Sequence, residues 1–371
     1  KSKYAYGDGI ENPDAIMVRS AAMHDMEMPK SLLAIARAGA GVNNIPVDRC
    51  TREGIVVFNT PGANANAVKE LVICGLLLAS RKVTAAYDWC KGLKGEGDNV
   101  GKLVEKGKSQ FAGPEIMGKT LGVIGLGAIG FKVAQAAEAL GMKIVGYDPF
   151  LSEGVKAALS ADTEIVEDIN DIFKKSDYIT IHVPLNDGTK DTVNKDTLAL
   201  CKDRVRILNF ARGGLVNSAD MIAALESGKA AAYVTDFPSD EVIGVDGVIA
   251  IPHLGASTPE SEDNCAVMAA SELKNFLENG NVINSVNFPT CDMGAVCGSR
   301  VTMWHKNIPA MLSQISAVFT NNGINIENMT NKSRGDYAYT MIDTHSAIGG
   351  DILSELKEID GTIRVTLFKE Q

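Results

Sequence analysis

Three segments in the second half of the chain each follow a short apolar run and carry a polar residue suited to chemistry: Arg212, Glu241 and His253. A guanidinium can bind a carboxylate and a keto oxygen at two points, and an imidazolium can donate a proton to that oxygen. A carboxylate beside the imidazole raises its pKa and orients it. These are the residue types that hydride transfer between a nucleotide cofactor and a 2-keto acid requires.

The choice of carboxylate stays open on the residues alone. Asp240 and Glu241 are neighbours in Asp236-Phe-Pro-Ser-Asp-Glu241, and either could stand beside the histidine. Asp236, which begins this segment, is better suited to accept a hydrogen bond from an amide of the cofactor. A lone histidine such as His253 is more often structural. The arginine and the acidic residues predicted to lie near it are what favour a chemical role.

A glycine-rich turn upstream of these residues predicts a dinucleotide site. Gly125-Leu-Gly-Ala-Ile-Gly130 follows the apolar run 121–124 and precedes residues 132–141, whose apolar side chains recur at helical spacing. The first glycine permits a tight turn, the second lets the backbone approach a pyrophosphate, and the third lets the helix pack on the strand. The amides at the start of the helix would face the anion.

An acidic residue decides which dinucleotide is expected. The predicted strand 142–148 ends in Asp148, close to the spacing of about 20 residues at which a carboxylate binds a ribose 2′-hydroxyl. A carboxylate there repels a 2′-phosphate, and no arginine follows it within the next few residues. We therefore expect NAD rather than NADP, and we expect no metal.

The elements that must position these groups alternate along the chain from residue 118 onward. Further strands are expected at 161–166, 178–183, 205–210, 231–234 and 248–251, with helices between them. This alternation predicts a parallel, doubly wound sheet covered by helices on both faces. Because such a sheet presents ligands at the carboxyl ends of its strands, Arg212, Glu241 and His253 would meet in one crevice.

Before the glycine turn the sequence predicts a smaller α/β domain. Residues 14–20 and 54–58 are expected strands, with 32–35 in a helix between them, and 64–81 reads as a long apolar helix. The loop Arg37-Ala-Gly-Ala-Gly-Val-Asn-Asn44 is either an ordinary turn or a nest of amides for a carboxylate. Composition leaves both interpretations open.

After residue 280 the pattern changes to that of a separate module. Strands are expected at 300–304, 324–330, 337–343 and 362–368, and helices at 311–319 and 352–359. This βαββαβ order predicts a split, ferredoxin-like unit. The polar residues 89–113 are expected to form a linker or an exposed excursion, and 259–278 a long helix that returns the chain to the first domain.

Composition excludes several classes of protein. The net charge of −10 argues against a nucleic-acid-binding surface, and no apolar run is long enough to span a bilayer. The seven cysteines are scattered without a CxxC pair, which fits reduced thiols in the cytoplasm. The chain starts with Lys rather than Met, so we expect residues to be missing before it.

Together the motifs around Gly125, Arg212, Asp236 and His253 resemble the D-2-hydroxyacid dehydrogenase family. The resemblance implies a Rossmann dinucleotide domain inserted in a smaller flavodoxin-like domain, followed by an ACT domain. The expected domains are 1–88 completed by 264–290, then 89–263, then 298–371. It also assigns the orienting carboxylate to Glu241 rather than Asp240, although the segment from Glu241 to His253 is shorter than in many relatives.

The same resemblance extends the site to cofactor and substrate. The residues implied at NAD are Gly125, Gly127, Ala128, Ile129, Gly130, Asp148, Pro184, Ala211, Asp236 and Gly255. Within the family the chain most resembles members that oxidise 3-phosphoglycerate, which implies that Arg19, Arg37, Gly41 and Val42 bind this substrate. Surface arginines with solvated head groups are the plainer reading of the two arginines.

The C-terminal module resembles the serine-binding ACT domains of these members, with His305, Asn307 and Asn325 at the amino acid. A purely assembling role for the module is the alternative. The resemblance also implies a homodimer or homotetramer, paired through segments such as the helix after Asn64. Two other functions remain open: a hydroxypyruvate or glyoxylate reductase, and an NAD-sensing binding protein like the corepressors of this fold.

Overall fold

The computed structural model describes residues 3–370, and the chain divides into two compact units. The central unit is Asn64–Ser261, and the terminal unit combines Lys1–Ala63 with Glu262–Gln371. No helix among the described residues is long and apolar enough to cross a membrane. The two units are described separately below.

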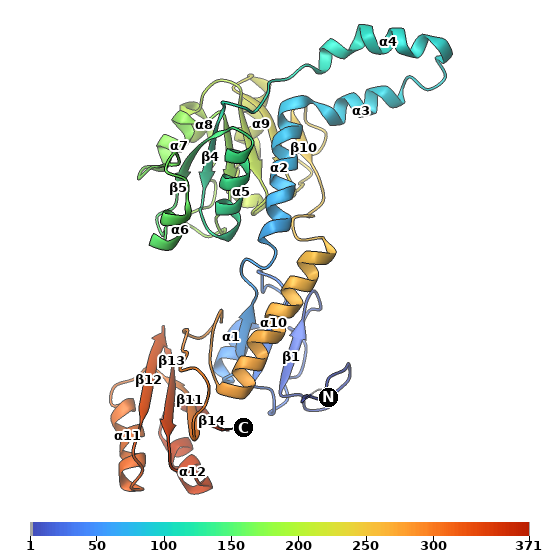
Figure 1. The fold of residues 1–371 in the computed structure, drawn as a ribbon. Coiled ribbons are helices and arrows are strands. Elements are labelled where there is room, and N and C mark those ends of the chain that lie inside the picture. The colour runs from blue at the N-terminus through green and yellow to red at the C-terminus, as the bar shows by residue number, and fades with distance from the viewer. Residues whose placement is uncertain (1–2, 371) are drawn as a thin grey trace. The chain divides into compact units, whose positions relative to one another are not determined.

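The central unit is built on seven parallel strands in the order β10-β9-β8-β7-β4-β5-β6 (Figure 1). The strands are β4 (Thr120–Ile124), β5 (Lys143–Tyr147), β6 (Glu164–Ile165), β7 (Tyr178–Ile181), β8 (Val205–Asn209), β9 (Ala230–Thr235) and β10 (Val248–Ala250). The predicted parallel sheet is confirmed. The strand order reverses between β4 and β7, and such a reversal opens a crevice at the carboxyl ends of these strands.

Helices cover both faces of this sheet, each over its own apolar core. On one face lie α2 (Ala65–Arg81) and α5 (Ala128–Ala139), and on the other lie α7 (Ile169–Lys175), α8 (Lys195–Leu200) and α9 (Ser218–Glu226). The short helix α6 (Glu153–Ala158) has no buried residue. Helix α2 packs on α5, β8 and β9, so it belongs to the central unit, whereas the sequence placed it in the first domain.

The stretch expected to be a linker or an excursion is a helical arm. It contains α3 (Val83–Lys91) and α4 (Val100–Gly107) with the short turns Gly97–Asn99 and Lys108–Phe111. None of these helices has a buried residue, and Figure 1 shows α3 and α4 extending away from the sheet. Exposure was predicted correctly. The helices were missed because the polar, glycine-containing sequence gives little helical periodicity.

A small parallel sheet forms the first part of the terminal unit. Its strands β1 (Ala15–Val18), β2 (Ala34–Arg37) and β3 (Val56–Asn59) lie in that order, and α1 (Val47–Arg52) precedes β3. The helix predicted over 32–35 is wrong, since residues from 34 onward form the central strand. Ala34, Ile35 and Ala36 are fully buried, and a short apolar run of this kind gives no periodicity that separates strand from helix.

The rest of the terminal unit is a long helix, α10 (Pro259–Asn279), and the C-terminal module. The module contains β11 (Ser299–Lys306), α11 (Met311–Asn321), β12 (Asn328–Arg334), β13 (Tyr337–Thr344), α12 (Gly350–Glu358) and β14 (Thr362–Lys369). Its antiparallel sheet has the order β12-β13-β11-β14, which confirms the βαββαβ prediction. Strand β12 begins later than expected. In the segment before it, Ile324 and Ile326 pack against the module's core.

Aromatic packing and one buried ion pair hold the module in the terminal unit. The Trp304 ring lies 4.6 Å from that of Tyr339 and 5.9 Å from that of Phe276 on α10. Arg300 is fully buried, and its Nε donates to Asp343 Oδ1 at 2.6 Å. The same guanidinium donates to the carbonyls of residues 279, 293 and 294, so it fixes the segment between α10 and the module.

We expect Arg300→Met to lower the free energy of unfolding by about 3–5 kcal/mol, because Asp343 would remain buried without its partner. Denaturant unfolding followed by circular dichroism measures this change. Lys174→Met, which breaks the exposed pair with Asp171 in the central unit, is the control and should leave the midpoint unchanged. Equal midpoints for the two variants would contradict a stabilising role for Arg300.

Candidate active site

The turn between β4 and α5 has the backbone geometry that a bound pyrophosphate needs. Gly125 has a φ of +90°, and a Cβ there would lie 2.7 Å from the His182 carbonyl oxygen. A Cβ on Gly130 would lie 1.9 Å from the Gly125 carbonyl oxygen, so the start of the helix contacts the turn directly. At Gly127 nothing lies within 4 Å of that position, which leaves the backbone open to a ligand. Each glycine therefore has the surroundings that its expected role demands.

Asp148 lies directly beside this turn. One carboxylate oxygen accepts from the Leu126 amide at 2.9 Å, and the other accepts from the Phe150 amide at 2.8 Å. These bonds fix the side chain at the end of β5. A carboxylate has about four acceptor sites, so Asp148 can still accept from a ribose hydroxyl. The fixed negative charge fits NAD and disfavours a 2′-phosphate.

Asn209 holds the backbone around Arg212, a role that the sequence reasoning missed. It is the last residue of β8 and is fully buried. Its Oδ1 accepts from the amides of Ala211 and Arg212 at 3.2 and 3.3 Å, and its Nδ2 donates to the Arg212 carbonyl at 2.8 Å. Asparagine two or three residues before a functional side chain is a signal for such a turn. The Arg212 guanidinium lies 6.0 Å from the centre of the Phe237 ring.

Asp236 and His253 lie close together after β9 and β10. The centre of the Phe237 ring, next to Asp236 in the chain, lies 4.6 Å from the centre of the His253 ring, and the two ring planes are tilted by 46°. Asp236 is fully buried, and its Oδ2 accepts from the Gly255 amide at 3.3 Å. Burial raises the pKa of Asp236, whereas the charges of His253 and Arg212 oppose that rise. Asp236 is thus a buried carboxylate that interacts electrostatically with His253.

One oxygen of Asp236 is left for a ligand. Its Oδ1 is buried and has no hydrogen-bond partner among the described residues. A buried carboxylate oxygen without a donor costs free energy, so its position suits a donor that arrives with a bound molecule. The amide of a nicotinamide ring supplies such a donor, which agrees with the role expected for Asp236.

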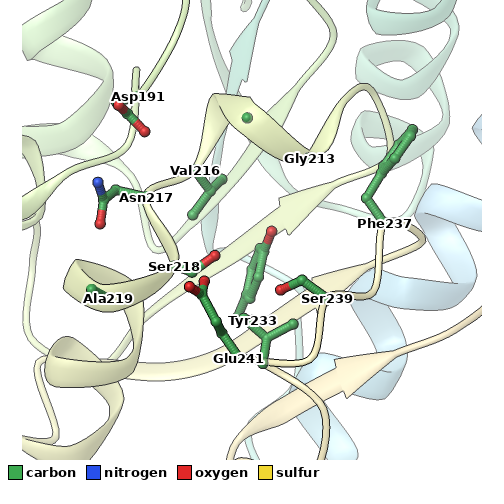
Figure 2. Close-up of a pocket in the computed structure, with 12 residues that line it drawn as sticks. Asp191, Gly213, Val216, Asn217, Ser218, Ala219, Tyr233, Phe237, Ser239 and Glu241 are labelled. Carbon is green, nitrogen blue, oxygen red and sulfur yellow. The ribbon is translucent and has the colours of Figure 1, made fainter.

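Glu241 lines a cavity of about 430 Å³. Its lining includes Gly213, Ser218, Tyr233 and Ser239, and Figure 2 shows the Glu241 carboxylate near Ser218 and beside the Tyr233 ring. His253 is not among the residues that line this cavity, and no hydrogen bond joins it to Glu241 within residues 3–370. Arg212, Asp236 and His253 therefore interact with one another, while the cavity that Glu241 lines also includes Phe237, whose ring contacts His253.

The expected substrate residues gather at one edge of the small sheet in the terminal unit. In the parallel register Val18 lies opposite Arg37, and Arg37 lies opposite Asn59. Arg37 Nε donates to the Arg19 carbonyl at 3.2 Å, so both arginines lie at the carboxyl ends of β1 and β2. Arg19 also forms an ion pair with Glu262 at 2.9 Å, and both side chains are largely exposed.

The loop after β2 offers free backbone donors at the same edge. The amides of Gly41 and Val42 donate to no described residue. The Asn59 side chain donates to the Ala40 carbonyl at 2.6 Å, and the Thr60 amide donates to the Gly39 carbonyl at 3.1 Å. Asn59 and Thr60 thus fix this loop, while two of its amides have no hydrogen-bond acceptor among the described residues. This arrangement fits anion binding better than an ordinary turn.

The three residues expected at serine have different surroundings. His305 is buried within β11, and its ring nitrogens contact the Lys306 carbonyl at 2.8 Å and Thr340 Oγ1 at 2.7 Å. Burial lowers its pKa. Asn307 and Asn325 are exposed, and their side-chain amides donate to the Gly335 carbonyl and to Glu327. Only the two asparagines are therefore accessible to a ligand.

Comparisons with known proteins agree with this geometry. A family model described as D-isomer specific 2-hydroxyacid dehydrogenase, NAD binding domain, matches residues 73–255. The chain is 38% identical to a D-3-phosphoglycerate dehydrogenase of Methanocaldococcus jannaschii over 77% of its own length and 54% of that relative. It is 34% identical to the enzyme of that name from Bacillus subtilis over 76% of its length and 53% of that relative. The chain thus spans about half the length of these curated relatives.

Two solved structures are similar in fold and sequence. A crystal structure of NAD⁺-bound 3-phosphoglycerate dehydrogenase from Entamoeba histolytica matches with a TM-score of 0.58 and 29% identity, over 74% of this chain and 82% of that one. A glyoxylate reductase from Paecilomyes thermophila matches with a TM-score of 0.62 and 27% identity, over 73% of this chain and 83% of that one. The glycine turn and the match over residues 73–255 together show that this part of the chain is the NAD-binding domain of the D-isomer specific 2-hydroxyacid dehydrogenases.

Proposed function

We propose that this protein catalyses the NAD-dependent oxidation of 3-phospho-D-glycerate to 3-phosphohydroxypyruvate, the first step of serine synthesis. The observation that carries the proposal is the cluster of Arg212, Asp236 and His253 after three adjacent strands of the NAD-binding domain. The curated relatives named D-3-phosphoglycerate dehydrogenase support the choice of substrate. The cytoplasm is the proposed location, which suits the seven free cysteines.

In this proposal the chain's own residues position the substrate and move one proton. Arg212 binds the carboxylate and the reacting oxygen at two points, and the Asn209 clamp keeps its backbone in place. His253 removes the hydroxyl proton during oxidation and returns it during reduction. NAD would supply the acceptor for the hydride that leaves the substrate carbon.

The negative charge beside His253 has two candidate sources. Asp236 places a buried carboxylate next to the imidazole. Glu241, which lines the cavity described above, keeps the orienting role that the family resemblance assigns to it. Either carboxylate could orient the imidazole toward the reacting oxygen.

The anionic end of the substrate is assigned to the terminal unit. Arg19 and Arg37 would supply positive charge, and the open amides of Gly41 and Val42 would donate to a carboxylate or phosphate. Reduction of glyoxylate or hydroxypyruvate is the second candidate function, favoured by the similarity to a glyoxylate reductase. That reaction would use the same histidine and arginine but would not need the phosphate.

Substrate choice is tested by following NADH absorbance with phosphohydroxypyruvate, hydroxypyruvate and glyoxylate side by side. We expect the phosphorylated substrate to give the highest kcat/KM, because its phosphate adds contacts to basic residues. His253→Ala should lower kcat by about 10²–10⁴ while NAD still binds. Arg212→Lys should be nearly as damaging, since an ammonium cannot make the planar two-point contact.

Equal efficiency with and without the phosphate would favour the reductase alternative. Loss of NAD binding in His253→Ala, measured by titration calorimetry, would instead give the histidine a structural role. Lys195→Ala, on an exposed helix start in the same domain, is the matched control and should behave as the unaltered protein.

We also propose that two copies of the chain pair through the α3–α4 arm. The arm has no buried residue, and its apolar side chains Val83 and Tyr87 are 50% and 64% exposed. Apolar surface on two projecting helices is stabilised when a second chain covers it. This replaces the helix α2 as the pairing surface, because most of the apolar face of α2 is already packed inside its own domain.

Light scattering at micromolar concentration should therefore give a mass of at least two chains. Tyr87→Glu with Val83→Glu should shift the protein toward the monomer by burying charge at the contact. Asp88→Ala, on the same helix, serves as the control. A monomeric unaltered protein would exclude pairing, and a dimeric double variant would place the contact elsewhere.

Serine is the proposed effector of the C-terminal module. Asn307 and Asn325 are exposed and offer both donors and acceptors, which suit the ammonium, carboxylate and hydroxyl of an amino acid. His305 enters the proposal as a support for the sheet, since Lys306 and Thr340 already occupy both ring nitrogens. A ligand held by the module changes activity only if it binds two arrangements of the protein differently.

We expect millimolar serine to inhibit the enzyme, and Asn307→Ala or Asn325→Ala to relieve inhibition while activity without serine stays intact. His305→Ala should lower the thermal unfolding midpoint because it leaves a buried partner unsatisfied. Initial rates over a serine titration and a melting curve measure the two effects. Full activity at millimolar serine would reduce the module to an assembly role.

A further inference from the structure

The terminal unit contains a buried carboxylate that has no role in the chemistry proposed above. Glu272 on α10 is only 9% exposed, and its Oε1 accepts from Asn284 Nδ2 at 2.8 Å. Its Oε2 is buried and has no hydrogen-bond partner among the described residues. Burial raises the pKa of Glu272 to about 7, and the hydrogen bond from Asn284 opposes that rise. A carboxyl group is rarely buried without a charged partner because its burial costs free energy. The position of Glu272 therefore suggests a specific role.

The partner of Glu272 begins a segment that lines the small sheet. Residues 284–286 run antiparallel to β3: the Asn59 amide donates to the Asn284 carbonyl at 3.3 Å, and the Val286 amide donates to the Val57 carbonyl at 2.9 Å. Asn284 has a φ of +57°, a left-handed conformation that asparagine tolerates better than most residues. Glu272 thus fixes the side chain of the residue whose backbone holds the end of β3.

The end of β3 in turn holds the loop with the open amides. The Asn59 amide donates to the Asn284 carbonyl, and the Asn59 side chain donates to the Ala40 carbonyl at 2.6 Å. Beyond Ala40 lie Gly41 and Val42, whose amides donate to no described residue. Hydrogen bonds therefore run without a break from Glu272 through Asn284 and Asn59 to this loop.

We propose that Glu272 is a positioning residue for the substrate loop 39–42, acting through Asn284 and Asn59. The carboxyl oxygen keeps Asn284 in its left-handed conformation, Asn284 keeps the end of β3 in register, and Asn59 presents the loop with its amides facing outward. The inference rests on the proposed function, in which those amides bind the anionic end of the substrate. Glu272 itself touches neither substrate nor cofactor in this proposal.

The alternative is that Glu272 only stabilises α10. Both readings predict lower stability when the side chain is removed, so stability does not separate them. They differ in what they predict for residues 39–42. Only the positioning role predicts that loss of the hydrogen-bond acceptor at residue 272 makes this loop more mobile. They also differ in kinetics, since a misplaced binding loop raises KM for the substrate and leaves KM for NAD unchanged.

The test compares Glu272→Gln with Glu272→Met in the full-length chain. Glutamine keeps an oxygen acceptor for Asn284, whereas methionine has similar volume and no such acceptor. We expect Glu272→Met to raise KM for 3-phosphoglycerate about 5–10-fold, the usual worth of one lost hydrogen bond, with kcat and KM for NAD within about twofold. Glu272→Gln should restore KM to near that of the unaltered protein. Lys274→Met, exposed on the same helix, is the control.

Hydrogen–deuterium exchange of the peptide spanning 36–44 gives a readout independent of turnover. Exchange should quicken in Glu272→Met and in Asn284→Gly, which fits the positive φ but lacks the donor, and should stay unchanged in Glu272→Gln and Lys274→Met. If the unaltered protein does not oxidise 3-phosphoglycerate, the proposed function fails and the exchange result alone decides the positioning role. Unchanged exchange in Asn284→Gly, or equal exchange in the Gln and Met variants, would overturn the inference.

Discussion

The hydrogen bonds of parallel strand pairing hold the carboxyl ends of β8, β9 and β10 at one edge of the central sheet, and the candidate site residues depend on this arrangement. Arg212, Asp236 and His253 each follow one of these strands, so residues far apart in the sequence become neighbours. The same constraint works on a smaller scale in the terminal unit, where Arg19 follows β1 and Arg37 ends the strand β2 that pairs with it. In both sheets the position of a side chain is set by where its strand stops.

Buried polar side chains then fix the loops that leave these strand ends. Asn209 binds three backbone groups around Arg212, and Asp236 accepts from the Gly255 amide two residues after His253. Glu272 does the same at a distance through Asn284. Each of these side chains sits in a low-dielectric environment, where a satisfied hydrogen bond is strong and an unsatisfied one is costly. The loops are held in place because moving them would leave these groups without partners.

Some expectations failed where packing decided the local structure. The run 32–35 contains only apolar residues and carries no periodicity, so the neighbouring strands β1 and β3 determine that the chain is extended from residue 34 onward. The helix α2 looked more apolar than a small domain needs, yet α5, β8 and β9 bury most of that surface. In the arm, helices form without a core of their own, which no pattern of burial in the sequence could indicate.

The sequence by itself determined the glycine turn, the acid at the end of β5, the parallel sheet and the βαββαβ module. Each of these features follows from the local spacing of particular residues or from the periodicity of apolar residues. It also predicted Arg212 and His253 as site residues, since their residue types and their place after apolar runs are local facts. Only the tertiary structure decided that Asp236 is buried and interacts with the histidine, and that His305 is internal to its sheet. The physical reason is that the direction of a side chain depends on loop geometry and on partners brought from distant strands, which residue spacing does not encode.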